Sequence, residues 1–242
     1  MSVQTALVLG ATGQVGGALL KELLASPHFT RVGEFGRRNT SLESLSTGKD
    51  KLEQKTIDFE KLDVAGLRDS KWDVVFISLG TTAKAAGSPE AFERIDREYV
   101  INAAKAAKSD HPQKLIYVSS SSADSKSRFL YLRSKGLTEE GLASLGYEET
   151  IVFRPGLLTG VNRPGFRLGE SMALAVSGVF SHFSSSLDIK ITTLAKSLVL
   201  AGQLGAAGLP AVAGAKQAGK DGARFTVIGN AGAVALAKEF KS

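Results

Sequence analysis

The chain has 242 residues, 43% of them hydrophobic, which is enough for one well-filled core. It has no cysteine, and its three histidines (His28, His111 and His182) are too far apart to suggest a ligand set, so disulfides, thiolate chemistry and a metal site are not expected. The formal net charge is +6, but the basic residues are scattered and not interleaved with aromatic ones, so direct nucleic-acid binding is not expected either.

Strand-like apolar runs alternate with helical patterns along most of the chain. Strands are predicted at residues 5–9, 32–35, 56–59, 73–79, 115–119, 150–153 and 225–228. Helices are predicted at 14–25, 90–108, 129–145 and 192–204, with a weaker helix at 61–70, and loops are expected at 40–55 and 205–222. This alternation is typical of parallel strands joined by crossover helices. We therefore expect an α/β fold with a Rossmann-like, doubly wound parallel sheet, as a single domain over 1–242 with a small C-terminal substrate-side lobe at about 157–223.

A glycine-rich turn separates the first predicted strand from the first predicted helix. Its glycines let the backbone turn tightly and approach a pyrophosphate, while the N–H groups and positive dipole of the helix N-terminus attract negative charge. The sequence therefore predicts a dinucleotide site, the alternative being a purely structural turn. The residues expected to contact the dinucleotide are Gly10, Thr12, Gly13, Gln14, Val15 and Gly16.

The second predicted strand is followed by Gly36, Arg37 and Arg38. In dinucleotide folds this strand end meets the adenosine ribose, where an acidic residue would exclude a 2′-phosphate. Two guanidinium groups stand here instead, and arginine pairs with phosphate through a planar fork. NADP(H) is therefore favoured over NAD(H), unless both arginines are only solvated surface charges. Asp58, on the third predicted strand, is expected either to meet the adenine or to begin a loop without binding a ligand.

The fourth and fifth predicted strands end in residues suited to a cofactor and a substrate. Ligands of open α/β sheets lie beyond the carboxyl ends of the strands, which would put Leu79, Gly80 and Thr81 against the cofactor. The fifth strand runs into four serines at 119–122. One of these hydroxyls could hold the substrate oxygen, and the register favours Ser120 over Ser119, although four serines equally suit a polar turn.

Tyr131 and Lys135 lie four residues apart in a predicted helix. At this spacing a phenol and an ammonium share one helix face and can reach one reacting group. The ammonium stabilises the phenolate, which tunes the tyrosine as a general acid or base for a carbonyl oxygen. The pair alone is a common coincidence, and its significance comes from the glycine-rich turn earlier in the same half of the chain.

Taken in chain order, these motifs resemble those of the short-chain dehydrogenase/reductase superfamily. The resemblance is carried by Gly10-x-x-Gly13-x-x-Gly16, Gly36-Arg37-Arg38, Leu79-Gly80-Thr81-Thr82, Ser119-Ser120, Phe129-Leu-Tyr131-Leu-x-x-Lys135 and Phe153-Arg-Pro-Gly156, and covers about residues 3–160. More narrowly, the chain resembles the atypical branch that contains the Tat-interacting protein oxidoreductases and their fungal mitochondrial-proteome relatives.

The resemblance implies roles for three of these residues. Tyr131 would be the proton donor or acceptor and would also contact the cofactor, and Lys135 would both tune Tyr131 and bind the nicotinamide ribose. Ser120 would be the hydroxyl that orients the substrate. Asp96 falls where other members of the superfamily often place an asparagine, which argues against a proton relay through that position.

The residues after the sixth predicted strand suit the substrate side of the site. By the same resemblance Pro155 lies beside the nicotinamide, and Leu158 makes a backbone contact with it. The apolar run 170–183 suits either a wall of the substrate pocket or core packing, and suits a membrane-contacting patch less well. If this run and loop 158–169 close over the site, the expected substrate is a small apolar aldehyde or ketone.

The expected function is NADPH-dependent reduction of a carbonyl group. The alternative, from a different class, is an NADPH-binding regulatory or interaction protein with little or no turnover. The set Ser120, Tyr131 and Lys135 favours the enzyme, because a regulator needs no general acid. An epimerase or dehydratase is disfavoured, since such enzymes usually need a larger sugar-nucleotide lobe.

The sequence says less about the localisation and oligomeric state of the protein than about its fold. The chain begins without an apolar signal region and has no apolar stretch long enough to cross a bilayer. The resemblance to the fungal proteins implies either a cytoplasmic protein or one attached peripherally to the mitochondrial outer membrane. It also suggests a homodimer packed through helices 90–108 and 129–145, with a monomer as the alternative.

Overall fold

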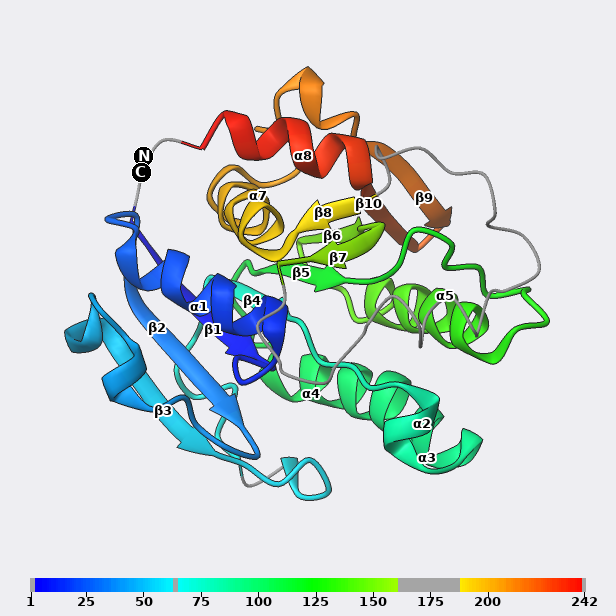
Figure 1. The fold of residues 1–242 in the computed structure, drawn as a ribbon, viewed down its shortest axis with the longest axis horizontal. Coiled ribbons are helices and arrows are strands. Elements are labelled where there is room, and N and C mark those ends of the chain that lie inside the picture. Colours follow the sequence, from blue (N-terminus) through cyan, green and yellow to red (C-terminus); the bar gives the residue numbers. More distant parts are fainter. Residues whose placement is uncertain (1–2, 63–64, 161–187, 241–242) are drawn as a thin grey trace.

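The computed structural model describes residues 3–62, 65–160 and 188–240. Its central sheet has eight strands in the order β3-β2-β1-β4-β5-β6-β10-β9, and each neighbouring pair is parallel except β10 with β9 (Figure 1). The strand order reverses between β1 and β4, and ligands of doubly wound sheets bind at such a switch point. The strands are β1 Gln4–Leu9, β2 Phe29–Gly36, β3 Leu52–Thr56, β4 Val74–Ile77, β5 Lys114–Val118, β6 Glu149–Arg154, β9 Lys216–Lys220 and β10 Ala223–Gly229.

Helices cover both faces of the sheet. Helices α1, α7 and α8 pack on one face, and α4 and α5 pack on the other (Figure 1). Short helices α2 and α3 precede α4, and a π-helical turn over Arg94–Glu98 joins α3 to α4. The helices are α1 Gln14–Ala25, α2 Ala83–Ala86, α3 Pro89–Glu93, α4 Tyr99–Ala107, α5 Leu130–Ala143, α7 Ile191–Leu204 and α8 Asn230–Lys238.

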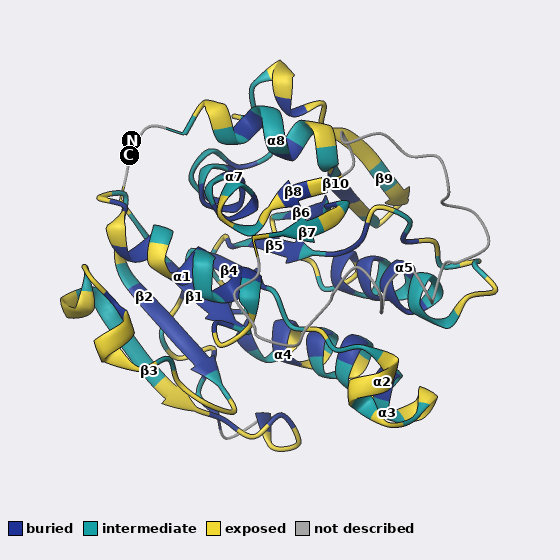
Figure 2. Cartoon of the chain, in the orientation of Figure 1, coloured by how far each residue is buried: buried dark blue, intermediate teal, exposed yellow. Residues whose placement is uncertain are grey.

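The core consists of two hydrophobic clusters, one on each side of the sheet. Alternate residues of a strand enter opposite clusters: Ala6 and Val8 of β1 pack on the α1 side, whereas Leu7 and Leu9 pack on the α4 side. The central strands are therefore buried on both faces (Figure 2). Burial on both faces explains why these strands read as continuous apolar runs rather than as alternating patterns.

A second, two-stranded sheet lies beyond the carboxyl end of β6. It pairs β7 (Leu157–Thr159) with β8 (Asp188–Lys190) in parallel. These strands flank residues 161–187, so the sequence prediction for 170–183 falls outside the described residues.

The structure confirms the predicted fold class and most of the predicted elements. Helix α1 has the predicted bounds, and the predicted helix 90–108 is present as α3, the π turn and α4. Strands form near every predicted position except the third. No helix of the described residues is long and apolar enough to cross a membrane.

The third strand was wrongly predicted at 56–59. It is β3, which begins at Leu52 and ends at Thr56, so the loop predicted at 40–55 was also wrong in its last part. As an edge strand β3 pairs only with β2 and has no buried residue, so it lacks an apolar run. The run that suggested a strand comes from Ile57 and Phe59, which enter the core after the strand has ended.

Two further predictions were wrong. Residues 65–70 form turns instead of the predicted helix. Within the predicted loop 205–222 lies β9, the antiparallel edge strand, whose lysines are exposed. Charged side chains on an edge strand discourage pairing with another chain.

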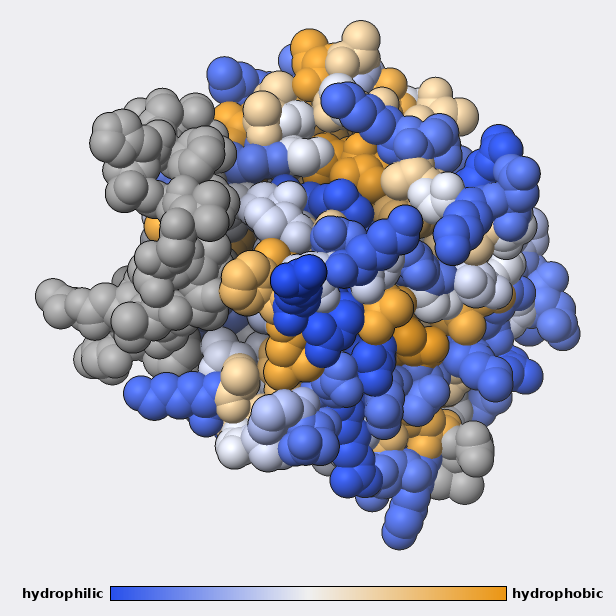
Figure 3. Space-filling view, turned by 90° about the vertical axis from the view of Figure 1, so that its right-hand side faces the viewer, coloured by the Kyte–Doolittle hydropathy of each residue, from blue (hydrophilic) through white to orange (hydrophobic). Residues whose placement is uncertain are grey.

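The face of the molecule seen in Figure 3 is mostly hydrophilic, with its hydrophobic groups in separate patches.

Candidate functional site

The turn after β1 depends on glycine at two positions. Gly10 has φ +99°, a conformation that L side chains rarely adopt. A Cβ at Gly16 would lie 2.1 Å from the Gly10 carbonyl oxygen, so any side chain there would displace the backbone. Gly13 differs, because its φ is −79° and a Cβ would meet only the Gly10 oxygen, at 3.1 Å. Gly10 and Gly16 therefore shape the turn, while Gly13 forms its exposed rim.

The N-terminus of α1 is open to a ligand. Gly13 is the N-cap residue and supplies no side chain to the free N–H groups of the first turn. The first intrahelical bond runs from the Gly17 N–H to the Gly13 carbonyl at 2.8 Å. Thr12 and Gly13 are exposed. Uncapped N–H groups and the helix dipole at an accessible turn make a site for a phosphate group.

We predict that Gly13→Val abolishes NADPH binding while the protein remains folded. The branched side chain would project at the exposed rim where a pyrophosphate must approach, and it would crowd the Gly10 oxygen only slightly. Fluorescence titration with NADPH and a thermal melt test this prediction. Gly16→Val is the contrasting variant, expected to lose the fold because of its backbone clash. Undiminished affinity with a lower melting temperature in Gly13→Val would instead indicate a purely structural turn.

The end of β2 presents two free guanidinium groups. Arg37 and Arg38 are exposed, and within the described residues neither forms an ion pair or hydrogen bond. The loop that carries them is fixed by Glu34, which is 1% exposed. Its carboxylate accepts from the Thr40 backbone N–H at 2.8 Å and from the Gln54 side chain at 2.7 Å. The arginines thus stand on an anchored loop with their charges available.

Asp58 lies beyond the end of β3, on an exposed turn. Its Oδ1 accepts from the backbone N–H of Glu60 at 3.0 Å. This local bond is the usual reason for an aspartate at the start of a loop. It agrees with the alternative in which Asp58 binds no ligand.

The loop after β4 connects the glycine-rich turn to helix α5. A Cβ on Gly10 would lie 2.9 Å from the Leu79 backbone nitrogen, so the β1 and β4 strand ends touch. On its other side the loop reaches Lys135, because a Cβ on Gly80 would lie 3.5 Å from the Lys135 Nζ and 3.2 Å from the Asp96 Oδ1. A side chain at position 80 would therefore press on both charged groups.

Lys135 is held by two buried groups from other elements. Its Nζ lies 2.9 Å from the Asp96 Oδ1 as an ion pair and donates a hydrogen bond to the Tyr117 hydroxyl at 3.1 Å. Lys135 is 5% exposed, and Asp96 and Tyr117 are both fully buried. Asp96 comes from the π-helical turn and Tyr117 from β5.

Electrostatics keep the Lys135 side chain charged. Burial alone would lower its pKa, but attraction to Asp96, together with Tyr117 and Tyr131, outweighs burial and raises the pKa well above the ordinary value. The pKa of Tyr117 is also raised, mainly by burial, with Lys135 acting in the opposite direction. At neutral pH the cluster is therefore an ammonium, a carboxylate and a neutral phenol.

Tyr131 lies one helical turn before Lys135, at the edge of this cluster. It is half-buried, and its ring centroid is 6.1 Å from that of Phe92 and 6.0 Å from the Lys135 Nζ. Its hydroxyl forms no hydrogen bond with the described residues. A phenol with this placement can donate to a bound oxygen.

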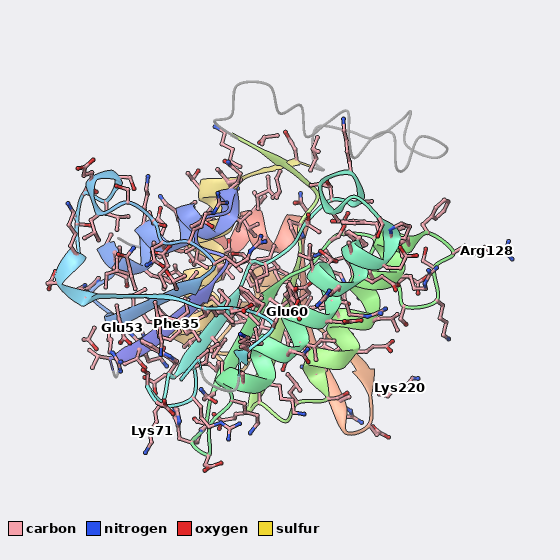
Figure 4. All side chains as sticks on the ribbon, turned by 90° about the horizontal axis from the view of Figure 1, so that it is seen from below. Phe35, Glu53, Glu60, Lys71, Arg128 and Lys220 are labelled. Carbon is pink, nitrogen blue, oxygen red and sulfur yellow. The ribbon has the colours of Figure 1, made fainter. Side chains whose placement is uncertain are left out.

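The serine turn after β5 packs against the start of α5. The Ser119 N–H donates to the Phe153 carbonyl at 2.8 Å, which extends the β5–β6 ladder past the strand end. Ser119 and Ser120 are each 7% exposed, and the Ser119 hydroxyl is enclosed without a partner among the described residues. A Cβ on Gly136 of α5 would lie 2.1 Å from the Ser125 nitrogen, so glycine is needed for the close approach. Arg128, further along this loop, points into solvent (Figure 4).

The end of β6 is tied to α5 and α8. The Arg154 Nε donates to the Glu139 Oε1 at 3.0 Å, and the Glu139 carboxylate is buried. The next residue, Pro155, is buried, and the Gly156 N–H donates to the Asn230 Oδ1 at 2.8 Å. These contacts fix the start of the segment that was predicted to meet the nicotinamide.

The structure brings together several of the predicted residues and separates others. The glycine-rich turn, Leu79, Gly80 and Lys135 form one contiguous group, with Tyr131 beside it. Arg37, Arg38 and Asp58 stand just beyond the ends of β2 and its edge-strand neighbour β3 in the same sheet. Thr81 is half-buried in the loop after Gly80, and Leu158 packs against the core from β7.

Sequence reasoning missed the partners of Lys135. The sequence pattern could have identified Asp96 as a buried charge, because it lies on the helix face that also carries Phe92 and Val100. Tyr117 is a polar-tipped residue inside an otherwise apolar strand. Asn230, which holds Gly156, gave no signal. Among the described residues, no group of three or more His, Cys, Asp or Glu side chains could hold a metal ion.

Comparison with known sequences identifies relatives of the chain. The profile of a family described as NAD(P)H-binding matches residues 10–178. Protein HTATIP2 of Rattus norvegicus is 34% identical over 200 residues, which cover 82% of this chain and 81% of that protein. The mitochondrial protein fmp52 of Emericella nidulans is 36% identical over 191 residues, covering 74% and 77% of the two chains.

Solved structures share the fold at much lower identity. MoeE5 in complex with UDP-glucose and NAD superimposes with a TM-score of 0.60 at 18% identity, covering 84% of this chain and 73% of MoeE5. The PhqB reductase domain from Penicillium fellutanum gives a TM-score of 0.62 at 14% identity, covering 85% and 65%. At these identities the likeness shows a common fold.

Proposed function

Because this chain belongs to the NAD(P)H-binding family, we propose that it is an NADPH-dependent reductase of aldehyde or ketone groups. Bound NADPH would supply the hydride. Tyr131 would give its proton to the carbonyl oxygen as charge develops there, and Lys135 would fix the geometry around it. Ser120 would hold the same oxygen, with Ser119 as the second choice.

One observation carries this proposal. The Lys135 ammonium is buried at the carboxyl edge of the sheet, against the loop that touches the glycine-rich turn, and within 6.0 Å of the Tyr131 ring. Burying a charged group is energetically costly, because the group loses its hydration. This burial supports the proposal, because it holds a cation near a phenol and next to the loop that touches the glycine-rich turn.

The residues present suit a bound NADPH. The uncapped N-terminus of α1 would hold the pyrophosphate, and Arg37 with Arg38 would hold the 2′-phosphate. The Leu79–Thr81 loop, Pro155 and Leu158 would line the nicotinamide half. The choice of a small apolar carbonyl compound as substrate rests on the sequence expectation that loop 158–169 and the apolar run 170–183 close over the site, and residues 161–187 lie outside the described part of the chain.

The direct test is a panel of aldehydes and ketones, with NADPH oxidation followed by absorbance. We expect turnover with at least one apolar member of the panel and little with highly polar carbonyls. Tight NADPH binding with no turnover across the panel would refute the reductase and favour an NADPH-binding regulatory protein. Conversion of a UDP-sugar in the presence of NAD(P)+, with no net change in the oxidation state of the cofactor, would point to epimerisation, an activity named for several structural neighbours.

We predict that the protein binds NADPH more tightly than NADH. Each charge-assisted bond from Arg37 or Arg38 to the 2′-phosphate should contribute about 1.5–3 kcal/mol, which NADH cannot gain. Affinities for both cofactors should be measured for wild type, Arg37→Ala and Arg38→Ala. The variants should lose affinity for NADPH but not for NADH, and Arg128→Ala, on the exposed loop before α5, serves as a charge-matched control. Equal wild-type affinities would refute the assignment.

We also propose a location and an assembly. The protein would be either cytoplasmic or attached peripherally to the mitochondrial outer membrane. Several fungal relatives are named as mitochondrial proteins, which supports the mitochondrial alternative. The proposed assembly is a homodimer packed through α4 and α5. Carbonate extraction and protease treatment of isolated mitochondria test the attachment, and sedimentation tests the dimer. A membrane-integral or matrix-protected protein would contradict the first proposal, and a monomer the second.

A further inference from the structure

Asp96 is a buried carboxylate that no step of the proposed reaction uses. It stands on the π-helical turn, is fully buried, and lies 2.9 Å from the Lys135 Nζ through its Oδ1. The Ser134 hydroxyl approaches its other oxygen at 3.5 Å, and the Thr138 hydroxyl donates to its backbone carbonyl at 3.4 Å. A carboxylate at this depth needs its cation, so Asp96 and Lys135 form one unit.

This unit has no net charge, which matters for the neighbouring phenol. A lone ammonium beside Tyr131 would draw off its proton by stabilising the phenolate, whereas a paired ammonium does so much less. Of the groups that face Lys135, the π turn contributes Asp96 and β5 contributes the neutral Tyr117. The loop after β4 contributes only the uncharged Gly80.

The other charged residues of α5 have partners of their own. The next buried charge along the helix is Glu139, one turn beyond Lys135 and away from Tyr131. It is already paired with Arg154 of β6. Arg133 donates to the Ser127 and Arg128 carbonyls of the loop before α5, and Glu140 accepts from the Ser125 hydroxyl. Lys135 and Asp96 are therefore the buried charges on the side of the helix where the Tyr131 ring lies.

We infer that Asp96 is a positioning residue that fixes the Lys135 ammonium and cancels much of its charge, so that Tyr131 keeps the proton it must donate in reduction. This inference rests on the proposed role of Tyr131 as proton donor. A site tuned in this way favours reduction at neutral pH, because only the protonated phenol can serve a carbonyl oxygen that is gaining charge.

The variant Asp96→Asn tests the inference, because it removes the charge and keeps the shape. The reduction rate should fall off with rising pH about one pH unit earlier than in wild type, since the Lys135 ammonium, still bonded to the Tyr117 hydroxyl, is no longer cancelled and promotes loss of the Tyr131 proton. If burial instead neutralises Lys135 in this variant, the midpoint does not move and the inference fails. Tyr117→Phe is the matched control: it removes a hydrogen bond from Lys135 but no charge. Its pH profile should keep the wild-type midpoint. An unmoved midpoint in Asp96→Asn, or an equal shift in both variants, would overturn the inference.

A second measurement does not depend on activity. The ionisation of Tyr131 can be followed by tyrosinate absorbance, as the difference between each protein and the same protein carrying Tyr131→Phe. The subtraction removes the signal of the other tyrosines, whose own pKa values are raised: burial raises the pKa of Tyr117 and Tyr147, and the hydrogen bond to Glu60 raises the pKa of Tyr99.

The two measurements separate the two proposals. The difference titration should show Tyr131 ionising at lower pH in Asp96→Asn than in wild type. If the wild type turns over no carbonyl, the proposed function fails while the titration still decides the role of Asp96. If turnover is present and the Tyr131 ionisation does not move, the reductase stands and the inference about Asp96 is wrong.

Discussion

Tyr131→Phe is expected to lower the rate of carbonyl reduction by about 10²–10⁴-fold, the usual contribution of a positioned general acid. The change deletes one oxygen, and that oxygen makes no hydrogen bond with the described residues, so fold and packing should be preserved. The NADPH affinity should also stay close to wild type, because the phenol acts on the substrate. Single-turnover NADPH oxidation with the best carbonyl of the panel measures the effect.

The matched control is Tyr147→Phe. Tyr147 is buried just before β6, at the opposite edge of the sheet, and its hydroxyl donates to the Ala104 carbonyl at 2.7 Å. Its loss should lower the melting temperature and leave the rate of reduction unchanged. Comparable rates in wild type and Tyr131→Phe would refute the catalytic role of Tyr131.

Lys135→Met is expected to lower the free energy of unfolding by about 3–5 kcal/mol, as is usual when one partner of a buried ion pair is removed. Methionine fills similar space, so the loss comes from Asp96, which remains fully buried without its cation. Because the pKa of Lys135 is raised, the pair is intact throughout the neutral range and is lost only as the pH rises above the ordinary lysine range. Denaturant unfolding at neutral pH is therefore the appropriate measurement.

The double variant Lys135→Met/Asp96→Asn separates stability from function. Without the buried charge it should recover much of the stability lost in Lys135→Met, while reduction and NADPH affinity remain low because the ammonium is gone. A Lys135→Met protein as stable as wild type would show that the ion pair contributes nothing to folding. Full activity in the double variant would show that Lys135 has no role in the site.

The sequence predicted the fold well where local patterns are strong. The central strands are apolar on both faces, and each is followed by a helix with its own apolar face, so β1 and α1 were recognisable without tertiary information. The edge strands β3 and β9 were not, because an edge strand has one neighbour and exposes most of its side chains. Their pairing comes from the sheet that they join and not from their own composition.

In the candidate site, too, local features could be predicted from the sequence, whereas contacts between distant segments could not. The glycine-rich turn and the spacing of Tyr131 and Lys135 are local features, and the structure places them at one edge of the sheet. The sequence could not show which glycine needs a positive φ, because that depends on the surroundings of each: Gly10 passes against the end of β4, whereas Gly13 is the N-cap residue of α1. It also could not show which serine hydroxyl is enclosed, since that depends on the β6 strand alongside.

The sequence by itself determined the doubly wound sheet, the glycine-rich turn and the phenol–ammonium pair, because each is encoded by residues close together in the chain. Only the tertiary structure decided the charge of the site. Asp96 reaches Lys135 because the π-helical turn packs against α5, and Tyr117 reaches it because β5 lies beneath the same helix. Both contacts join distant segments, and burial makes each of them strong; no pattern within a single segment specifies such a pairing.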